Sequence, residues 1–172
     1  VCMLALTVQL TCPAAAQWKD WDYDLDQEKK PWSEMQMQLP LYPKPDNLLK
    51  FDLGSNTSNQ FYIDAASISV GEDKVVRYTL VVKTGGGATN VSFEGIRCET
   101  AELRVYAFGH ANAQWSRARD GNWRPIVYRE VNGHHNTLYR SFMCTQTRNR
   151  EAGNVKGIIA ALKRGDTVLG AP

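Results

Sequence analysis

Apolar runs of membrane-spanning length are missing from this chain of 172 residues. The most apolar stretch lies within residues 1–16 (VCMLALTVQLTCPAAA), which is shorter than the roughly 20 residues that a transmembrane helix needs. This stretch carries no charge and ends in three alanines, which is typical of the A-x-A cleavage site of a secretory signal peptide. We therefore interpret residues 1–16 as the end of a signal peptide and expect the rest of the chain to be exported, with no transmembrane segment.

Cysteine is scarce, with four residues in the chain. Cys2 and Cys12 lie in the predicted signal segment, so cleavage leaves Cys98 and Cys144. An even number of cysteines in an exported chain favours a disulfide, and neither residue has the neighbouring Cys or His of a zinc site. Lipid attachment at Cys12 is disfavoured because Thr11, rather than a small residue, precedes it. We therefore predict a Cys98–Cys144 disulfide and no free thiol nucleophile.

Histidine is rarer still, and catalytic motifs built on it are absent. The chain has three histidines, His110, His134 and His135, and contains no HExxH, H-x-x-x-H or G-x-S-x-G motif. Adjacent residues of an extended chain point to opposite faces, so His134 and His135 would not easily share a metal. We expect all three histidines to be exposed in loops, and we predict no catalytic residue, metal ligand or cofactor.

Acidic residues leave one catalytic arrangement open. Glu94 with Glu99 or Glu102 could form the carboxylate pair that glycosidases need. Glu99 and Glu102 flank a predicted strand boundary, however, and this position favours surface ion pairs with Arg97 and Arg104. Surface ion pairs are the preferred interpretation.

Charge is distributed unevenly, although the net charge is only +2. Residues 17–73 contain eleven acidic and five basic residues, whereas residues 74–172 contain seven acidic and fifteen basic residues. A nucleic-acid-binding surface would need a basic stripe that is not neutralised, and export also argues against a nucleic acid partner. We expect an acidic N-terminal arm to neutralise a basic body.

The arm, residues 17–47, contains several prolines, which disfavour a long regular element. Its acidic series Asp20, Asp22, Asp24 and Asp26 resembles a calcium loop, but Pro31 occupies the place of the bidentate glutamate. Acidic and apolar residues alternate here, so an extended chain would place them on opposite faces. We expect the arm to dock on the body through its apolar residues, which are Trp21, Tyr23 and Leu25, and a disordered tail is the alternative that its prolines and charge would also allow.

Residues 48–172 have the pattern of an α+β domain, with a mostly antiparallel β-sheet and a C-terminal amphipathic helix packed on one face. Apolar residues recur at helical spacing over 152–164, and Gly165 is a natural helix end. An Asp-Gly pair between two apolar-containing runs, 115–118 and 123–127, predicts a hairpin. The other strands are predicted from short β-branched runs over 48–53, 60–63, 66–70, 75–83, 90–100, 102–108 and 137–144.

Aromatic and basic residues gather in one part of the sequence, between residues 106 and 129. Such clusters can stack on sugars or hold anionic ligands, although they are more often a core surrounded by basic side chains. The wider cluster includes Tyr106, Phe108, Arg119 and Arg129. The candidate ligand-binding residues are Trp115, Trp123, Tyr128, Arg117 and Arg124.

Several sequence blocks resemble the CNP1-like family of exported proteobacterial proteins. They are residues 61–64 (FYID), 67–71 (SISVG), 75–81 (VVRYTLV), 90–100 (NVSFEGIRCET) and 120–123 (DGNW). The most specific is the V-S-aromatic-E-G-I-R-C motif, and the resemblance covers most of residues 45–165. It implies export and a single small domain, but no particular activity and no catalytic or binding residues.

These observations lead to a functional hypothesis. We expect a periplasmic, non-catalytic binding or interaction module of the cell envelope, with a cell-wall ligand or an envelope protein as its unidentified partner. A small periplasmic hydrolase whose active site the sequence does not reveal is the alternative.

Overall fold

The computed structural model describes residues 31–53, 57–127, 133–146 and 150–165. The described residues from Trp32 onward belong to one compact unit. The predicted signal segment and the apolar anchors Trp21, Tyr23 and Leu25 lie outside the described residues, as does Tyr128. No helix in the described part of the chain is long and apolar enough to cross a membrane.

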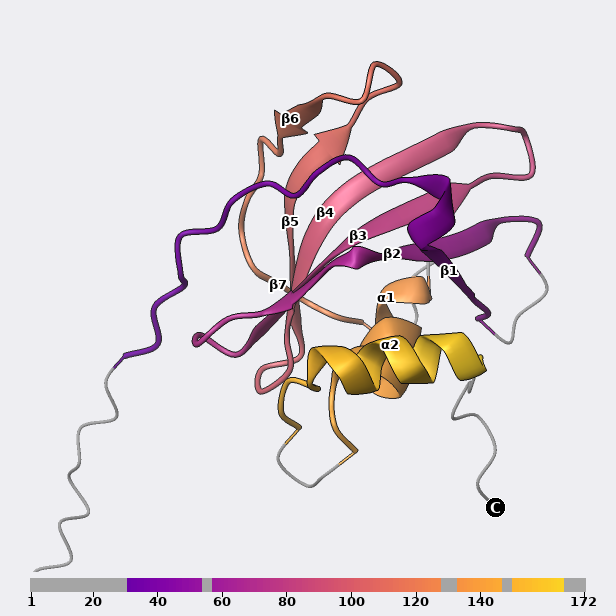
Figure 1. Cartoon of the computed structure of the whole chain (residues 1–172). Coiled ribbons are helices and arrows are strands. Elements are labelled where there is room, and N and C mark those ends of the chain that lie inside the picture. Colours follow the sequence, from indigo (N-terminus) through magenta and orange to yellow (C-terminus); the bar gives the residue numbers. More distant parts are fainter. Residues whose placement is uncertain (1–30, 54–56, 128–132, 147–149, 166–172) are drawn as a thin grey trace, which may run out of the picture. The chain divides into compact units, whose positions relative to one another are not determined.

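An antiparallel sheet forms the centre of this unit (Figure 1). Its first six strands lie side by side in the order of the sequence, and β7 pairs with β5 beyond the end of β6. Short connections between successive strands produce such antiparallel neighbours, whereas parallel neighbours would need crossovers. The strands are β1 (Leu48–Phe51), β2 (Gln60–Val70), β3 (Val75–Lys83), β4 (Thr89–Arg97), β5 (Glu102–Gly109), β6 (Trp115–Arg117) and β7 (Arg124–Pro125).

A short 3-10 helix at Pro45–Asn47 precedes β1, and in the described ranges after residue 127 three helical segments follow the sheet. Helix α1 (His134–Thr137) continues directly into the helical segment η2 (Leu138–Met143), and α2 is Val155–Arg164. Figure 1 shows α1 and α2 on the same face of the sheet, which we call the helix side. The sheet and its C-terminal helix confirm the predicted α+β class, although α2 begins three residues after the predicted start.

The main core lies on the helix side because alternate strand residues point there. In β3, Val76, Tyr78 and Leu80 belong to this core, and Ile158 and Leu162 enter it from α2. The disulfide between Cys98 and Cys144 closes the core, with a Cα–Cα distance of 5.6 Å, and confirms the predicted pairing. It joins the chain just after β4 to the end of η2, so the helical segment is covalently tied to the sheet.

The opposite face is crossed by residues 32–44, which we call the strap (Figure 1). No strand or helix is assigned in the strap. A small second core, formed by Phe93, Tyr106 and Ala107, packs against Met37 of the strap and against Trp115. We call this face the strap side.

Two strand predictions are wrong. The predicted strand over 137–144 is the end of α1 followed by η2. Its buried residues, Leu138, Phe142 and Met143, follow a helical spacing rather than an alternation. The predicted hairpin at Asp120-Gly121 does not form either, because β6 and β7 each pair with β5 and not with each other.

The histidine prediction is wrong for two of the three residues. His110 is exposed, but His134 and His135 are buried at the start of α1, with exposures of 7% and 8%. His134 stacks on Phe61 and its ring centroid lies 4.0 Å from that of His135. The extended-chain argument failed because these residues are helical, and adjacent rings on a helix need not point to opposite faces.

Candidate ligand-binding site

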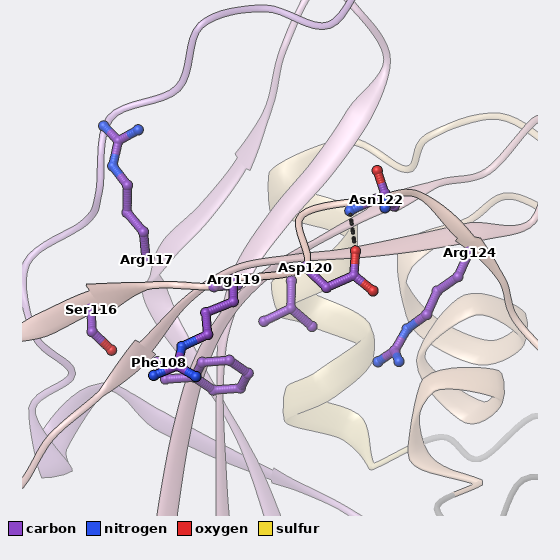
Figure 2. Close-up of a pocket in the computed structure, with 9 residues that line it drawn as sticks. Phe108, Ser116, Arg117, Arg119, Asp120, Asn122 and Arg124 are labelled. Carbon is purple, nitrogen blue, oxygen red and sulfur yellow. Dashed lines mark hydrogen bonds between the residues drawn. The ribbon is translucent and has the colours of Figure 1, made fainter.

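A pocket of about 380 Å³ lies where β5, β6 and the following loop meet (Figure 2). We call it the arginine pocket. Three arginines contribute to its lining, together with one acidic residue, one amide and an aromatic ring. The lining residues are Val105, Phe108, Ser116, Arg117, Ala118, Arg119, Asp120, Asn122 and Arg124.

The register of the sheet places the pocket on the helix side, at the β5–β6 end. Phe108 lies opposite Ser92 of β4 and opposite Ser116 of β6, and directly opposed residues of an antiparallel pair share a face. Helix α2 contacts β1 and β2, at the other end of the sheet. Phe108 is therefore left 48% exposed, which is unusual for a large aromatic residue on this face.

The loop after β6 is held at both of its ends by backbone hydrogen bonding to β5. The N–H of Ala118 donates to the carbonyl of Tyr106 at 2.9 Å, and Arg124 pairs with Leu103. Within the loop, the Asp120 carboxylate accepts from the N–H of Asn122 at 3.1 Å. This Asx-type bond orders the backbone around Gly121 locally, while β6 and β7 each pair with β5 instead of with each other.

Two of the three guanidinium groups face the same space. Figure 2 shows the Arg119 and Arg124 side chains extending from the backbone on the same side as the Phe108 ring, whereas Arg117 points the opposite way. Among the described residues, neither Arg119 nor Arg124 forms an ion pair. Guanidinium groups that have no ion-pair partner in the described ranges and lie beside an exposed ring are suited to an anionic ligand that also has an apolar face.

The structure separates the predicted ligand-binding residues. Arg117 and Arg124 both line the arginine pocket, although the Arg117 guanidinium points away from it. The two tryptophans pack instead beside the strap. Trp115 donates its indole N–H to the Pro40 carbonyl at 3.0 Å, and Trp123 donates to Glu34 at 3.2 Å.

The predicted set did not include several lining residues, notably Phe108 and Arg119. Both belong to the aromatic and basic cluster of the sequence, so residue type alone marked the region. Assigning them to one face required the pairing of β5 with β6, because that register places Ser116 and Phe108 together and Trp115 on the other side.

Glu34 forms the densest polar cluster of the strap side. Its carboxylate accepts from the Tyr106 hydroxyl at 2.5 Å and from the Trp123 indole, and it forms ion pairs with Arg77 at 3.4 Å and with Arg104. Burial and the hydrogen bond to Glu34 raise the pKa of Tyr106, so the phenol remains a donor. The predicted ion pairs of Glu99 and Glu102 form with Arg97, at 3.7 Å and 3.8 Å. Arg104 pairs with Glu34 instead.

Asp73 holds the start of the strap beside the same cluster. Its carboxylate contacts Arg77 at 2.6 Å and accepts from the backbone N–H of Met35 at 2.9 Å, while its carbonyl accepts from the Trp32 indole. Burial alone would raise the pKa of Asp73, but the hydrogen bonds from Arg77 and from backbone N–H groups hold it below its usual value. The strap is thus attached through directed polar contacts.

Glu94 forms a second buried cluster, on the helix side. It accepts from the Ser92 hydroxyl at 2.6 Å and the Tyr78 hydroxyl at 3.1 Å, and it contacts His135 Nε2 at 2.9 Å. Burial would raise the pKa of Glu94, but attraction to His135 and the hydrogen bonds lower it to about 2. With its oxygens occupied by three side chains of the core, Glu94 has the surroundings of a structural carboxylate.

No group of three or more His, Cys, Asp or Glu side chains with metal-site geometry occurs in the described part of the chain.

Comparisons with known proteins identify one family. The sequence profile of the CNP1-like family matches residues 27–163. "Cryptic neisserial protein 1" of Neisseria gonorrhoeae (strain ATCC 700825 / FA 1090) is 25% identical over 146 residues, covering 72% of this chain and 72% of the relative. No solved structure matches the chain.

Proposed function

Since the chain belongs to the CNP1-like family, which assigns it no reaction, we propose a function from the site: a non-catalytic binding module of the cell envelope that takes an anionic ligand in the arginine pocket. The observation that carries the proposal is the pair Arg119 and Arg124, which lack ion-pair partners among the described residues and flank a half-exposed Phe108. Export to the periplasm is part of this proposal, and residues 1–16 support it.

A carboxylated sugar of the cell wall is the ligand class that suits this lining best. Phe108 offers a ring face for the apolar face of a sugar, and the Ser116 hydroxyl, which also bonds His110 Nε2 at 2.8 Å, offers a hydrogen-bonding group for a sugar hydroxyl. The two guanidinium groups supply charge-assisted donors for a carboxylate. The volume of about 380 Å³ lies in the range of small-molecule sites and suits one sugar ring rather than a polymer.

A direct test compares N-acetylmuramic acid with N-acetylglucosamine, which lacks the lactyl carboxylate, by calorimetric titration. We expect the acidic sugar to bind and the neutral sugar to bind at least about tenfold more weakly, since a lost charge-assisted contact leaves the guanidinium groups unpaired. Because both arginines are exposed, added salt should weaken binding. Inorganic phosphate, used as a third probe, tests whether charge alone is sufficient.

Arg117 provides a matched control within the same pocket. Replacing Arg119 and Arg124 together by alanine should raise the dissociation constant at least about tenfold. Arg117→Ala should change it by no more than about twofold, because the Arg117 guanidinium points away. Equal losses in both variants would contradict the assignment, as would the absence of binding by all three probes.

The hydrolase alternative makes a different prediction. It requires turnover of a cell-wall fragment and loss of turnover in Glu94→Gln, because Glu94 and His135 form the one buried acid–histidine pair in the described part of the chain. Binding without turnover supports the module.

A further inference from the structure

Trp123 connects the arginine pocket to the strap. It lies between two residues that line the pocket, Asn122 and Arg124, but its own side chain is on the strap side. There its ring packs edge-on against Trp32 at 5.9 Å and against Tyr106 at 6.5 Å. The loop over residues 118–124 therefore has one surface in the pocket and its tryptophan beside the strap.

Glu34 supports this loop through two contacts. The first is the hydrogen bond of 3.2 Å from the Trp123 indole. The second passes through Arg104, whose guanidinium pairs with Glu34 and lies so close to Gly121 that a Cβ there would be 3.2 Å from Arg104 Nη2. The Glu34 carboxylate thus contacts both the Trp123 indole and the Arg104 guanidinium, which lies beside Gly121.

Among the described residues, the Trp123 indole makes the one hydrogen bond from a side chain of the loop over residues 118–124 to another segment of the chain. The bond from Asn122 to Asp120 is internal to the loop, and the pairings with β5 hold only its two ends. The positions of Asp120 and Asn122, in the middle of the loop, consequently depend on a group that lies in the strap, whereas Arg124 is also held by its pairing with β5.

We infer that Glu34 is a positioning residue for the arginine pocket, so that docking of the strap and binding of the anionic ligand are energetically coupled. A bound ligand would stabilise the loop conformation in which the Trp123 indole bonds Glu34. The docked strap would stabilise the same loop conformation, which is the one that binds the ligand. Coupling between two sites acts equally in both directions. The inference rests on the proposed function, because it takes the pocket as the ligand site.

The first experiment needs no ligand. The exchange rate of the Trp123 indole proton can be followed by NMR, with Trp123→Phe used to assign its signal. Glu34→Ala removes the acceptor, and we expect the indole exchange rate to rise at least about tenfold, as for a site that opens locally. Glu34→Gln keeps an oxygen acceptor and should retain slow exchange.

Met37→Ala is the control for general weakening of the strap. Met37 packs against the cluster of Phe93, Tyr106 and Ala107, and it forms no hydrogen bond with the loop in the described part of the chain. It should leave the Trp123 indole exchange close to that of the unmodified protein. If Glu34→Ala leaves the exchange rate unchanged, or if Met37→Ala raises it equally, the positioning role is overturned.

The second experiment measures the coupling with N-acetylmuramic acid as the probe. Glu34→Ala should weaken binding about tenfold, and Met37→Ala by no more than about twofold. In Trp123→Phe, adding Glu34→Ala should cost less affinity than it does in the unmodified protein, because the effects of substitutions at two residues in direct contact are not additive.

The two experiments separate the two proposals. If the unmodified protein does not bind any of the three probes, the proposed function fails, while the indole exchange still decides the positioning role. If the probe binds the unmodified protein and Glu34→Ala with equal affinity, the coupling is overturned and the proposed function stands.

Discussion

On the helix side of the sheet, α2 and the segment from α1 to η2 cover the strands with apolar side chains, and a disulfide ties the end of η2 to the sheet. On the strap side, residues 32–44 cross the strands without regular structure and attach through Glu34, Asp73 and the indoles of Trp32, Trp115 and Trp123. Apolar burial is not directional, whereas hydrogen bonds and ion pairs depend on geometry.

Because of this difference, we expect the two covers of the sheet to lose stability in response to different kinds of substitution. The helix side should respond mainly to covalent and packing changes. The strap side should respond to the loss of single polar groups, because a buried partner left unpaired costs more than the original bond contributed. The arginine pocket opens on the helix side but depends on the strap side through Trp123.

The largest expected effect is removal of the disulfide. Cys98 and Cys144 are separated by 46 positions, and closure of a loop of this length stabilises the folded state by about 4 kcal/mol in the chain-entropy model. The double variant Cys98→Ala and Cys144→Ala should lose about this much in denaturant unfolding. Exchange of amide protons in η2 and α2 should increase most.

The same double variant tests whether the helix side and the strap side open independently. The Trp123 indole proton, on the strap side, should keep its slow exchange in the double variant. Equal loss of protection on both faces would show that the two covers open together. Alkylation before and after reduction gives the direct check, because native protein should contain no free thiol from these two cysteines.

The second expected effect is a loss of stability in acid, arising on the helix side. Burial, with repulsion from His135 as a smaller contribution, lowers the pKa of His134 to about 4 from an ordinary value of 6.5. The unfolded chain therefore takes up a proton at His134 before the folded protein does. The free energy of unfolding should fall as the pH drops from about 6.5 to about 4, by about 2–3 kcal/mol from this group.

Glu94 adds a second acid-sensitive range. Its pKa is lowered to about 2 from 4.5, so its contribution is present above pH 4.5 and is lost as the pH falls toward 2. Denaturant unfolding of His134→Asn, measured at several pH values, separates the two groups. The variant should lose much less stability than the unmodified protein between pH 6.5 and 4, but should still lose stability below 4.5. Parallel curves throughout would contradict the role given to His134.

The third prediction concerns the strap side. Glu34→Ala leaves Arg77, Arg104, Tyr106 and the Trp123 indole without their shared acceptor. Breaking a fully buried pair costs several kcal/mol, but the Arg104 side chain is 32% exposed, so we expect about 2 kcal/mol. Denaturant unfolding measures the loss. Replacement of the exposed Glu99, which contacts Arg97 at 3.7 Å, is the control and should cost less than about 0.5 kcal/mol.

The sequence was sufficient for the elements whose pattern is local. The β-branched run in β3 and the apolar stripe of α2 predicted a strand and a helix, and each element has the corresponding buried residues. The disulfide followed from the number of cysteines that remain after the predicted cleavage. The same reasoning failed over 138–143, where Leu138 and Phe142 are compatible with either period and tertiary packing selected the helix.

Little of the strap side could be predicted, because its contacts are distant in the sequence. Glu34 lies 43 positions from Arg77 and 89 positions from Trp123, and no local pattern marks either pair. The arginine pocket could be predicted from the sequence in part. Arg117 and Arg124 are close in the sequence and both line it, but the directions of their side chains required the register of β5 with β6.

The smallest expected effect is at the start of α2, where the helix side depends on one local polar contact. Asn154 has an extended backbone, and its side-chain oxygen accepts from the backbone N–H of Gly157 at 2.7 Å. Asn154→Ala leaves that N–H without a protein acceptor and should cost about 1 kcal/mol in denaturant unfolding, whereas Asn154→Ser should retain most of the stability because serine caps helices equally well. The loss should be confined to α2, since Ile158 and Leu162 would still be buried by the rest of the helix and the Trp123 indole should be unaffected. A loss in Asn154→Ala as large as that in Glu34→Ala would mean that single polar contacts matter equally on both faces, and the contrast between an apolar cover and a polar one would then be wrong.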